Sequence, residues 1–219
     1  MTPDPSRPIS IVIINGSARP GNYTAMASAL VADELSNHPR VAVQNVDPRT
    51  LDLALPGTAP PSAGVKSLQE SVATAAAVVL ATPEYHGSFS SVMKLVIESL
   101  GFPSLLRGKP VALLGVAAGS IGAVKSLEHL RGVVSHIGAL PLPLAVSIAN
   151  VQSVFDANGR CQDPAIEKLI RGVGANLMNY LEQHVCPRVT LERLLREGVV
   201  SVAADLVLRP HATGGSAQA

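Results

Sequence analysis

Short apolar runs alternate along the chain with longer segments in which apolar residues recur every three or four positions. Such runs are typical of strands buried in a parallel sheet, and the recurring spacing is typical of the helices that cover one. The apolar runs predict five strands, at residues 9–14, 41–46, 75–81, 110–116 and 140–148. The amphipathic segments predict five helices, at residues 25–36, 65–74, 88–100, 120–137 and 163–184.

Regular alternation of strands and helices favours an α/β fold with a parallel sheet. The first run, residues 9–14, is nearly all apolar, so we expect it near the centre of the sheet, covered on both faces. The fifth run contains Pro141 and Pro143, which cannot donate ladder hydrogen bonds, so we expect it at an edge. Five parallel strands predict a flavodoxin-like three-layer sandwich with the strand order 2-1-3-4-5.

The two ends of the chain stand apart from this pattern. Residues 1–8 carry three prolines and are expected to be a loose lead. Pro187 is expected to end the fifth helix, so the predicted domain spans residues 9–186. The appendage, residues 187–219, is expected to hold one extra helix at 189–208 and a disordered polar tail.

One internal connection, residues 47–64, is long and rich in Pro, Gly and Ala. Long loops in compact domains are often functional. A surface connection without a role in the site is nevertheless the simpler interpretation, because the segment has no clear periodicity.

Composition and charge narrow the class of protein. Hydrophobic residues make up 47% of the 219 residues and charged residues 15%, which suits a buried sheet. The net charge of +1 gives no support for a nucleic-acid partner. No run reaches the roughly 18 apolar residues that a membrane span needs. The scattered histidines form no metal-ligand pattern, and two distant cysteines, Cys161 and Cys186, favour free thiols in a reducing cytoplasm.

The loop GSARPGNYT, residues 16–24, follows the first predicted strand and leads into a helix. Gly16 and Gly21 permit a tight turn, the short polar side chains offer donors, and Arg19 adds a forked cation. A helix N-terminus adds free N–H groups and the positive end of the helix dipole. The loop therefore predicts a phosphate site, with an ordinary turn and an exposed arginine as the alternative. It matches neither a Walker A motif nor GxGxxG.

Two further loops are expected at the same edge of the sheet. In TPEYHGSFS, residues 82–90, Tyr85 and His86 place flat side chains beside Gly87, which suits a planar heteroaromatic ligand. The alternative is a packing loop with Tyr85 in the core and His86 in solvent. The small residues 117–122 would let backbone groups reach a ligand, although a tight turn into a helix explains them equally well.

The sequence has no GxSxG motif, the nucleophile elbow of α/β-hydrolases, so a serine hydrolase is disfavoured.

The paired motifs make the chain resemble the NAD(P)H-dependent FMN reductase family, flavodoxin-like flavoproteins that include quinone, chromate and azo reductases. The family's first loop reads GSxRxxSxN, and Gly16, Ser17 and Arg19 match it. Its second motif, PEYNxSxPGxLKNxxD, is matched at Pro83, Glu84, Tyr85, Ser88, Lys94 and Glu98. Asn22, Thr24, His86, Ser90 and Ser91 depart from the two motifs.

The resemblance implies an oxidoreductase that transfers hydride from NADPH or NADH to FMN and then to a small-molecule acceptor such as a flavin or a quinone. It implies a homodimer or homotetramer, and no metal or catalytic acid–base residue is expected. The implied phosphate ligands are Ser17, Arg19, Asn22, Tyr23 and Thr24. The implied ring contacts are Pro83, Glu84, Tyr85, His86, Gly87, Gly119, Ser120 and Gly122. The alternative function is a flavodoxin-type FMN electron carrier without NAD(P)H turnover.

Overall fold

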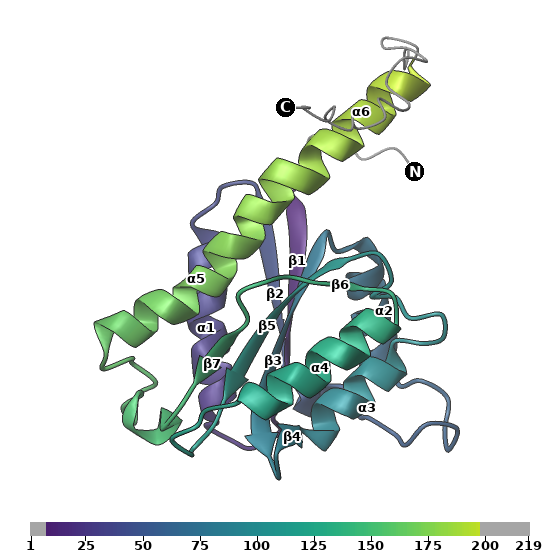
Figure 1. Cartoon of the computed structure of the whole chain (residues 1–219). Helices are drawn as coiled ribbons and strands as arrows, with labels where there is room; N and C mark the ends of the chain where they lie inside the picture. Colours follow the sequence, from purple (N-terminus) through teal and green to yellow (C-terminus); the bar gives the residue numbers. More distant parts are fainter. Residues whose placement is uncertain (1–7, 198–219) are drawn as a thin grey trace, which may run out of the picture.

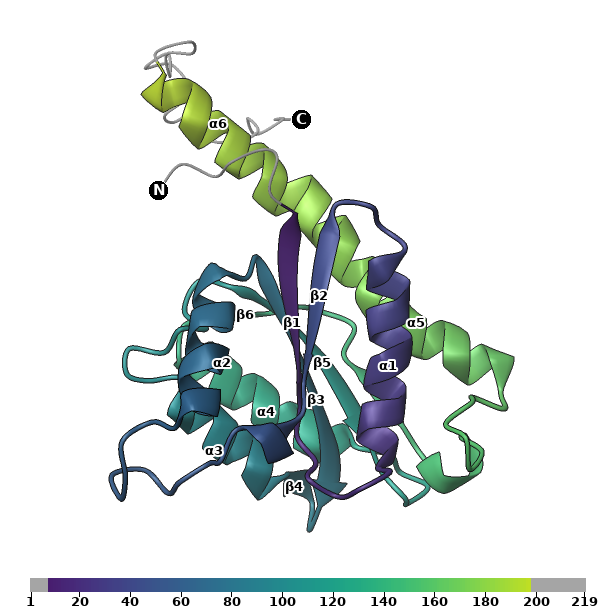
Figure 2. The same cartoon turned by 180° about the vertical axis from the view of Figure 1, so that it is seen from behind.

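The computed structural model describes residues 8–197 and places a twisted sheet between two layers of helices (Figure 1, Figure 2). The strands are β1 (Ile9–Asn15), β2 (Val41–Val46), β3 (Ala77–Tyr85), β4 (Ser88–Phe89), β5 (Pro110–Val116), β6 (Leu140–Pro141) and β7 (Val146–Ile148). The helices are α1 (Tyr23–Ser36), α2 (Ala63–Thr74), α3 (Ser91–Ser99), α4 (Val124–His136), α5 (Pro164–Tyr180) and α6 (Cys186–Arg196), with short helical turns η1 (Pro48–Thr50), η2 (Val151–Ser153) and η3 (Leu181–Val185).

The sheet has the order β2-β1-β3-β5-β6, with β7 also paired to β5. All of these pairs are parallel, which confirms the predicted order 2-1-3-4-5. The fifth predicted strand is split into β6 and β7, and it lies at the edge as its prolines predicted. The Arg131 side chain donates to the Pro141 and Leu142 carbonyls at 3.3 and 2.8 Å, so it satisfies carbonyl groups where the strand is interrupted.

Alternate residues of the central strand face opposite layers, as the pleat requires. Ile11 and Ile13 of β1 pack with α1 and α5 on one face. Val12 and Ile14 pack with α2, α3 and α4 on the other, and all four side chains are fully buried. The apolar run of β1 therefore anchors both cores, which explains why it shows no polar alternation.

A short hairpin, β3 to β4, was not predicted by the hydrophobic pattern, which placed a helix from residue 88. Glu84 pairs with Phe89 and Tyr85 with Ser88 in antiparallel register. The two turn residues, His86 and Gly87, have φ angles of 52° and 74°, the arrangement of a tight hairpin turn. Helix α3 consequently begins at Ser91 rather than at residue 88.

The last helix continues through Pro187, so the expected break there was wrong. α5, η3 and α6 form one rod that extends beyond the sheet (Figure 1). In η3 the Cys186 N–H bonds the Leu181 carbonyl, a wider π-type turn, and this widening accommodates the next residue, which is a proline. The C-terminal part of the predicted helix 189–208, most of the predicted lead and the predicted tail lie outside the described residues.

Within residues 8–197, no helix is both long and apolar enough to cross a bilayer. The same part of the chain holds no group of three His, Cys, Asp or Glu side chains arranged to bind a metal. Cys161 and Cys186 are free thiols in the structure.

The packing of α4 on β5 predicts opposite effects for one substitution at two glycines. At Gly115, an added Cβ would lie 2.7 Å from the Ala123 Cβ and 2.9 Å from the Leu127 Cγ, so α4 would have to shift. We expect Gly115→Ala to lower the free energy of unfolding by about 1–3 kcal/mol. Gly172, inside α5, has open space around it, and Gly172→Ala should raise that free energy by about 0.5–1 kcal/mol. Urea denaturation measures both, and equal effects would contradict the described packing.

Candidate functional site

Three loops follow β1, β3 and β5 at the carboxyl edge of the sheet, where the last residue of β1 pairs with Ala81 and the last residue of β5 pairs with Pro83. The first loop, residues 16–22, is fixed to the strand beside it, since the Gly16 N–H donates to the Ala81 carbonyl at 2.7 Å. The Ser90 hydroxyl donates to the Gly16 carbonyl at 2.5 Å and accepts from the Met93 N–H at 3.0 Å, which caps α3. One serine thus joins the first loop to the helix that follows the second.

Asn22 organises the inside of the first loop. Its side-chain Oδ1 accepts from the Ala25 N–H at 2.8 Å and caps α1. Its Nδ2 donates to the Arg19 carbonyl at 2.7 Å and, more weakly, to the Ser17 carbonyl at 3.4 Å. Both polar atoms of the Asn22 side chain therefore already have partners within the loop, so the side chain holds the loop in shape.

Two hydroxyl groups at the N-terminus of α1 are buried without an acceptor. Ser17 and Thr24 are 3% and 1% exposed. Among the described residues, no hydrogen bond is donated by either hydroxyl; Ser17 Oγ only accepts from the Arg19 N–H at 3.5 Å. Buried polar hydrogens normally have partners, so these two call for an external acceptor. The first N–H groups of α1, at Tyr23 and Thr24, are also left free by helix geometry and face the same end of the dipole.

The remaining first-loop residues reach in different directions. The Arg19 guanidinium lies 4.9 Å from the centre of the Tyr85 ring, so it bridges the first and second loops by a cation–π contact. The Tyr23 ring instead stacks on Phe155, with ring centres 6.3 Å apart, and packs against the core. Tyr23 can therefore serve a phosphate only through its backbone N–H.

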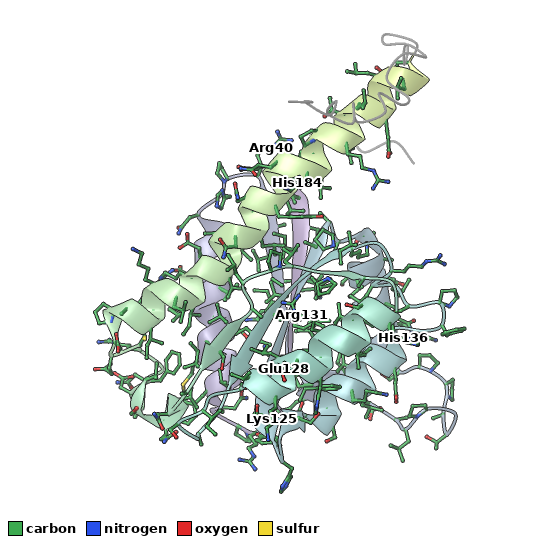
Figure 3. The ribbon with its side chains drawn as sticks, in the orientation of Figure 1. Arg40, Lys125, Glu128, Arg131, His136 and His184 are labelled. Carbon is green, nitrogen blue, oxygen red and sulfur yellow. The ribbon has the colours of Figure 1, made fainter. Side chains whose placement is uncertain are left out.

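The second loop is docked on α4. The Glu84 carboxylate accepts from the Ser126 N–H at 3.1 Å, in the first turn of a helix whose N-cap, Ala123, offers no capping side chain. The Ser88 hydroxyl lies 3.1 Å from His129 Nδ1. Lys125 lies beside the hairpin, at the N-terminal end of α4 (Figure 3). Glu84, at the end of the neighbouring strand β3, thus caps α4. The sequence had predicted Glu84 only as a contact of the ring.

The rest of the hairpin and the third loop present small or exposed groups. Pro83 is buried in β3, whereas Tyr85, His86, Gly119 and Ser120 are exposed. Gly122 has a φ of 76°, and a Cβ there would meet the Ser147 hydroxyl at 2.5 Å, so only glycine fits.

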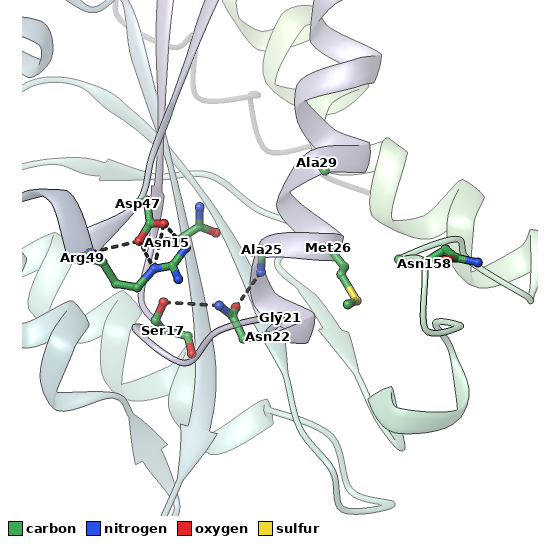
Figure 4. Close-up of a pocket in the computed structure, with 11 residues that line it drawn as sticks. Asn15, Ser17, Gly21, Asn22, Ala25, Met26, Ala29, Asp47, Arg49 and Asn158 are labelled. Atoms are coloured by element: carbon green, nitrogen blue, oxygen red, sulfur yellow. Dashed lines mark hydrogen bonds and ion pairs between the residues drawn. The ribbon is translucent and has the colours of Figure 1, made fainter.

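A cavity of about 340 Å³ adjoins the first loop (Figure 4). It is lined by Ser17 and Asn22 from the loop and by Asp47 and Arg49 from the segment after β2. Sequence reasoning missed the last two residues because it treated residues 47–64 as a surface connection. The sequence did contain a signal for them. Two charged residues, in Asp47-Pro48-Arg49, directly follow a predicted strand that ends at the same edge of the sheet.

Asp47 and Arg49 form one fixed unit. The Asp47 carboxylate accepts from the Arg49 backbone N–H at 2.9 Å and from the Arg49 side chain at 2.9 Å through Nε and 2.5 Å through Nη2. These hydrogen bonds lower the pKa of Asp47, against a smaller opposing effect of burial, and raise the pKa of Arg49. Both groups are therefore charged at neutral pH.

Beneath this pair, the Asn15 side chain closes the end of β1. Its Nδ2 donates to Asn45 Oδ1 at 2.8 Å and to the Val46 carbonyl at 3.2 Å, and its Oδ1 accepts from the Ser28 hydroxyl at 2.7 Å. This buried network holds β1, β2 and α1 together directly below the first loop.

Comparisons with known proteins agree with this architecture. The sequence profile of a family described as NADPH-dependent FMN reductase matches residues 9–153. A NAD(P)H-dependent FMN reductase of Pseudomonas aeruginosa is 32% identical over 174 residues, which cover 74% of this chain and 90% of that protein. An FMN-dependent NADPH-azoreductase of Staphylococcus haemolyticus is 32% identical over 142 residues, covering 62% of this chain and 74% of that protein.

Among solved structures, the flavoenzyme NAD(P)H:(acceptor) oxidoreductase FerB of Paracoccus denitrificans has a similar fold, with a TM-score of 0.66 at 21% identity. The match covers 80% of this chain and 98% of FerB.

The fold and the three loops define a flavodoxin-like α/β protein with a candidate anion site at the carboxyl edge of its sheet. The chain belongs to the NADPH-dependent FMN reductase family, which confirms the resemblance found in its loop motifs. It is therefore a flavin-dependent oxidoreductase with FMN and NAD(P)H as cofactors. The donor set of the first loop fits the phosphate of FMN, since two buried hydroxyls and two helix N–H groups lack acceptors there.

The double role of Ser90 predicts that its loss weakens both folding and FMN binding. Ser90→Ala removes the α3 cap and frees the Gly16 carbonyl, whereas Ser62→Ala removes a comparable cap at α2, where Ser62 also donates to the Leu51 carbonyl. Each variant should lower the free energy of unfolding by about 1 kcal/mol. Only Ser90→Ala should also raise the Kd for FMN, by about three- to tenfold. Flavin fluorescence titration tests this, and equal Kd values in the two variants would contradict the coupling.

Proposed function

We propose that this protein is an NAD(P)H-dependent FMN reductase that passes reducing equivalents through FMN to a small-molecule acceptor. The observation that carries the proposal is the pair of buried hydroxyls without acceptors, Ser17 and Thr24, at the N-terminus of α1. A phosphate monoester supplies several acceptor oxygens and matches the positive end of the helix. Membership of the FMN reductase family supports FMN as the source of that phosphate.

The proposed phosphate ligands are the hydroxyls of Ser17 and Thr24, the backbone N–H groups of Tyr23 and Thr24, and the Arg19 guanidinium. Arg19 is exposed, and its guanidinium contacts the ring of Tyr85 rather than a carboxylate. Its positive charge therefore remains available to a phosphate at the loop. Asn22 holds the loop in shape through its side chain.

The proposed ring site lies between the second and third loops. Tyr85, His86 and Gly87 form its hairpin side, and Gly119, Ser120 and Gly122 form the other. Pro83 and Glu84 support it from behind, because Pro83 is buried and Glu84 caps α4. Tyr85, His86, Gly119 and Ser120 are exposed, so these residues are accessible to a flat group at the sheet edge.

When bound, FMN supplies the two-electron chemistry, and the protein supplies position and electrostatics. The first loop fixes one end of the cofactor, and the docked hairpin fixes the position of its ring. Because hydride transfer needs close alignment of two rings, rigid loops contribute through orientation. We assign no proton-transferring side chain. Flavins, quinones and azo compounds are the proposed acceptors, and the FMN reductase and azoreductase relatives support the first and the last of these.

We also propose that the protein acts as a homodimer or homotetramer in the cytoplasm. A second cavity, of about 570 Å³, lies between α3 and α4 and is lined by Ile97, Val133, Ile137 and the fully exposed Phe102. An exposed phenylalanine beside an apolar cavity supports an interface between copies of the chain at this face.

The free thiols of Cys161 and Cys186 support a reducing compartment. The FMN-binding unit is proposed to be residues 9–186, with 187–219 as its appendage.

Steady-state oxidation of NADPH and of NADH, followed by nicotinamide absorbance with and without FMN, tests the proposal. Turnover that depends on FMN is expected, because FMN links donor to acceptor. FMN binding without NAD(P)H turnover would contradict the reductase assignment and leave the electron-carrier alternative. Adding an azo dye or a quinone as terminal acceptor, with FMN still present, then identifies the preferred class.

Arg19 provides a prediction specific to the phosphate. We expect Arg19→Ala to weaken FMN binding by about 1.5–3 kcal/mol, as for loss of a hydrogen bond to a charged group. Riboflavin, which has no phosphate, should bind wild-type protein and variant equally. An unchanged affinity for FMN in fluorescence titration would remove Arg19 from the site.

A further inference from the structure

A second arginine lies beside the first loop, in the segment that follows β2. Arg49 lies in η1, two residues beyond Asp47, and lines the cavity that Ser17 and Asn22 also line. Figure 4 shows the Arg49 side chain on the same side of the loop as Ser17, at the end of β2. Neither of the two family motifs in the sequence includes this segment.

Asp47 holds the Arg49 guanidinium in a fixed orientation. The carboxylate takes the edge formed by Nε and Nη2. Nη1 has no partner among residues 8–197, so the second edge of the fork stays open. The Arg49 side chain is 51% exposed, which leaves this edge accessible to a ligand in the cavity. A guanidinium that is clamped on one edge has less conformational entropy to lose when its other edge binds an anion.

The cavity that Arg49 lines also holds groups that suit a phosphate monoester. Ser17, in the same cavity, contributes a buried hydroxyl with no acceptor, and the N-terminus of α1 lies beside it. A forked guanidinium, a hydroxyl and a helix terminus together match an oxyanion that has several acceptor oxygens.

We propose that Arg49 is a second phosphate-binding residue of this enzyme, held in position by Asp47. The inference rests on the proposed function, which offers two sources of the same chemistry. One is the 5′-phosphate of FMN, and the other is the ribose 2′-phosphate that distinguishes NADPH from NADH. In other dinucleotide-binding sheets, an acidic residue or an arginine near the end of the second strand reads that ribose position.

The test compares wild type, Arg49→Ala and the control Arg188→Ala. Arg188 forms an exposed ion pair with Glu192 on α6, so the control removes an arginine in a similar pair away from the cavity. Two ratios are measured for each protein: the Kd of riboflavin over that of FMN, and the kcat/KM of NADPH over that of NADH.

We expect Arg49→Ala to lower one ratio by about tenfold or more, and Arg188→Ala to change neither. A fall in the riboflavin-to-FMN ratio assigns Arg49 to the FMN phosphate, and a fall in the NADPH-to-NADH ratio assigns it to the 2′-phosphate. Asp47→Asn should lower the same ratio by a smaller factor, because it loosens the clamp but keeps the cation. A stability change alone would leave both ratios intact.

If both ratios in Arg49→Ala equal those of wild type, the inference is overturned while the proposed function stands. If wild-type protein binds FMN no better than riboflavin and oxidises neither nucleotide, the proposed function itself fails and the inference fails with it. The two failures are therefore distinguished by the wild-type measurements.

Discussion

The contact between Gly16 and the start of the second loop sets the geometry of the whole sheet edge. A Cβ at Gly16 would lie 3.0 Å from the Ala81 carbonyl oxygen and 3.1 Å from both the Met93 Cβ and the Ser90 hydroxyl. The absence of that atom lets β1 and β3 end side by side while Ser90 joins the loop to α3. The first and second loops are consequently one rigid unit, to which the third is tied through Glu84 and the first turn of α4.

This rigid edge keeps polar groups unsatisfied at a cost to folding. The buried hydroxyls of Ser17 and Thr24 each forgo a hydrogen bond in the protein alone, and such a deficit typically costs about 1–3 kcal/mol per group. Natural proteins tolerate this at sites where a ligand repays it. Two arginines also lie at this edge, Arg19 against the Tyr85 ring and Arg49 in an ion pair with Asp47, although the net charge of the chain is only +1.

Periodicity was sufficient to predict the type of most elements, because buried parallel strands and their covering helices differ in length and spacing. The strand order then followed from the regular alternation of five strands with helices, which is typical of a flavodoxin-like sheet. The prolines at 141 and 143 correctly placed the fifth strand at the edge. The hairpin after Tyr85 was missed because it depends on two residues with positive φ, and His86 gives no sign of that in the sequence. Pro187 misled for a related reason, since a local π-type turn absorbs it.

Contacts in the candidate site were predictable where both partners lie in one loop and unpredictable where the partners lie far apart in the chain. The sequence of the first loop indicated that Ser17, Arg19 and Thr24 lie near one helix N-terminus, and the structure has Ser17 and Arg19 in the loop that leads to α1 and Thr24 in its first turn. The hydrogen bond that Glu84 accepts from the first turn of α4 was not predicted, because its partner, Ser126, lies 42 positions away. Asp47 and Arg49 enter the cavity only because β2 ends beside β1, a fact of topology rather than of local sequence.

We propose that the first loop binds the phosphate of FMN and thereby sets the position of the ring. A crystal structure of the protein with FMN is the decisive measurement. We expect phosphate oxygens within hydrogen-bond distance of the Ser17 and Thr24 hydroxyls, with the flavin ring lying between the second and third loops. A phosphate bound elsewhere, with both hydroxyls still lacking an acceptor, would contradict it.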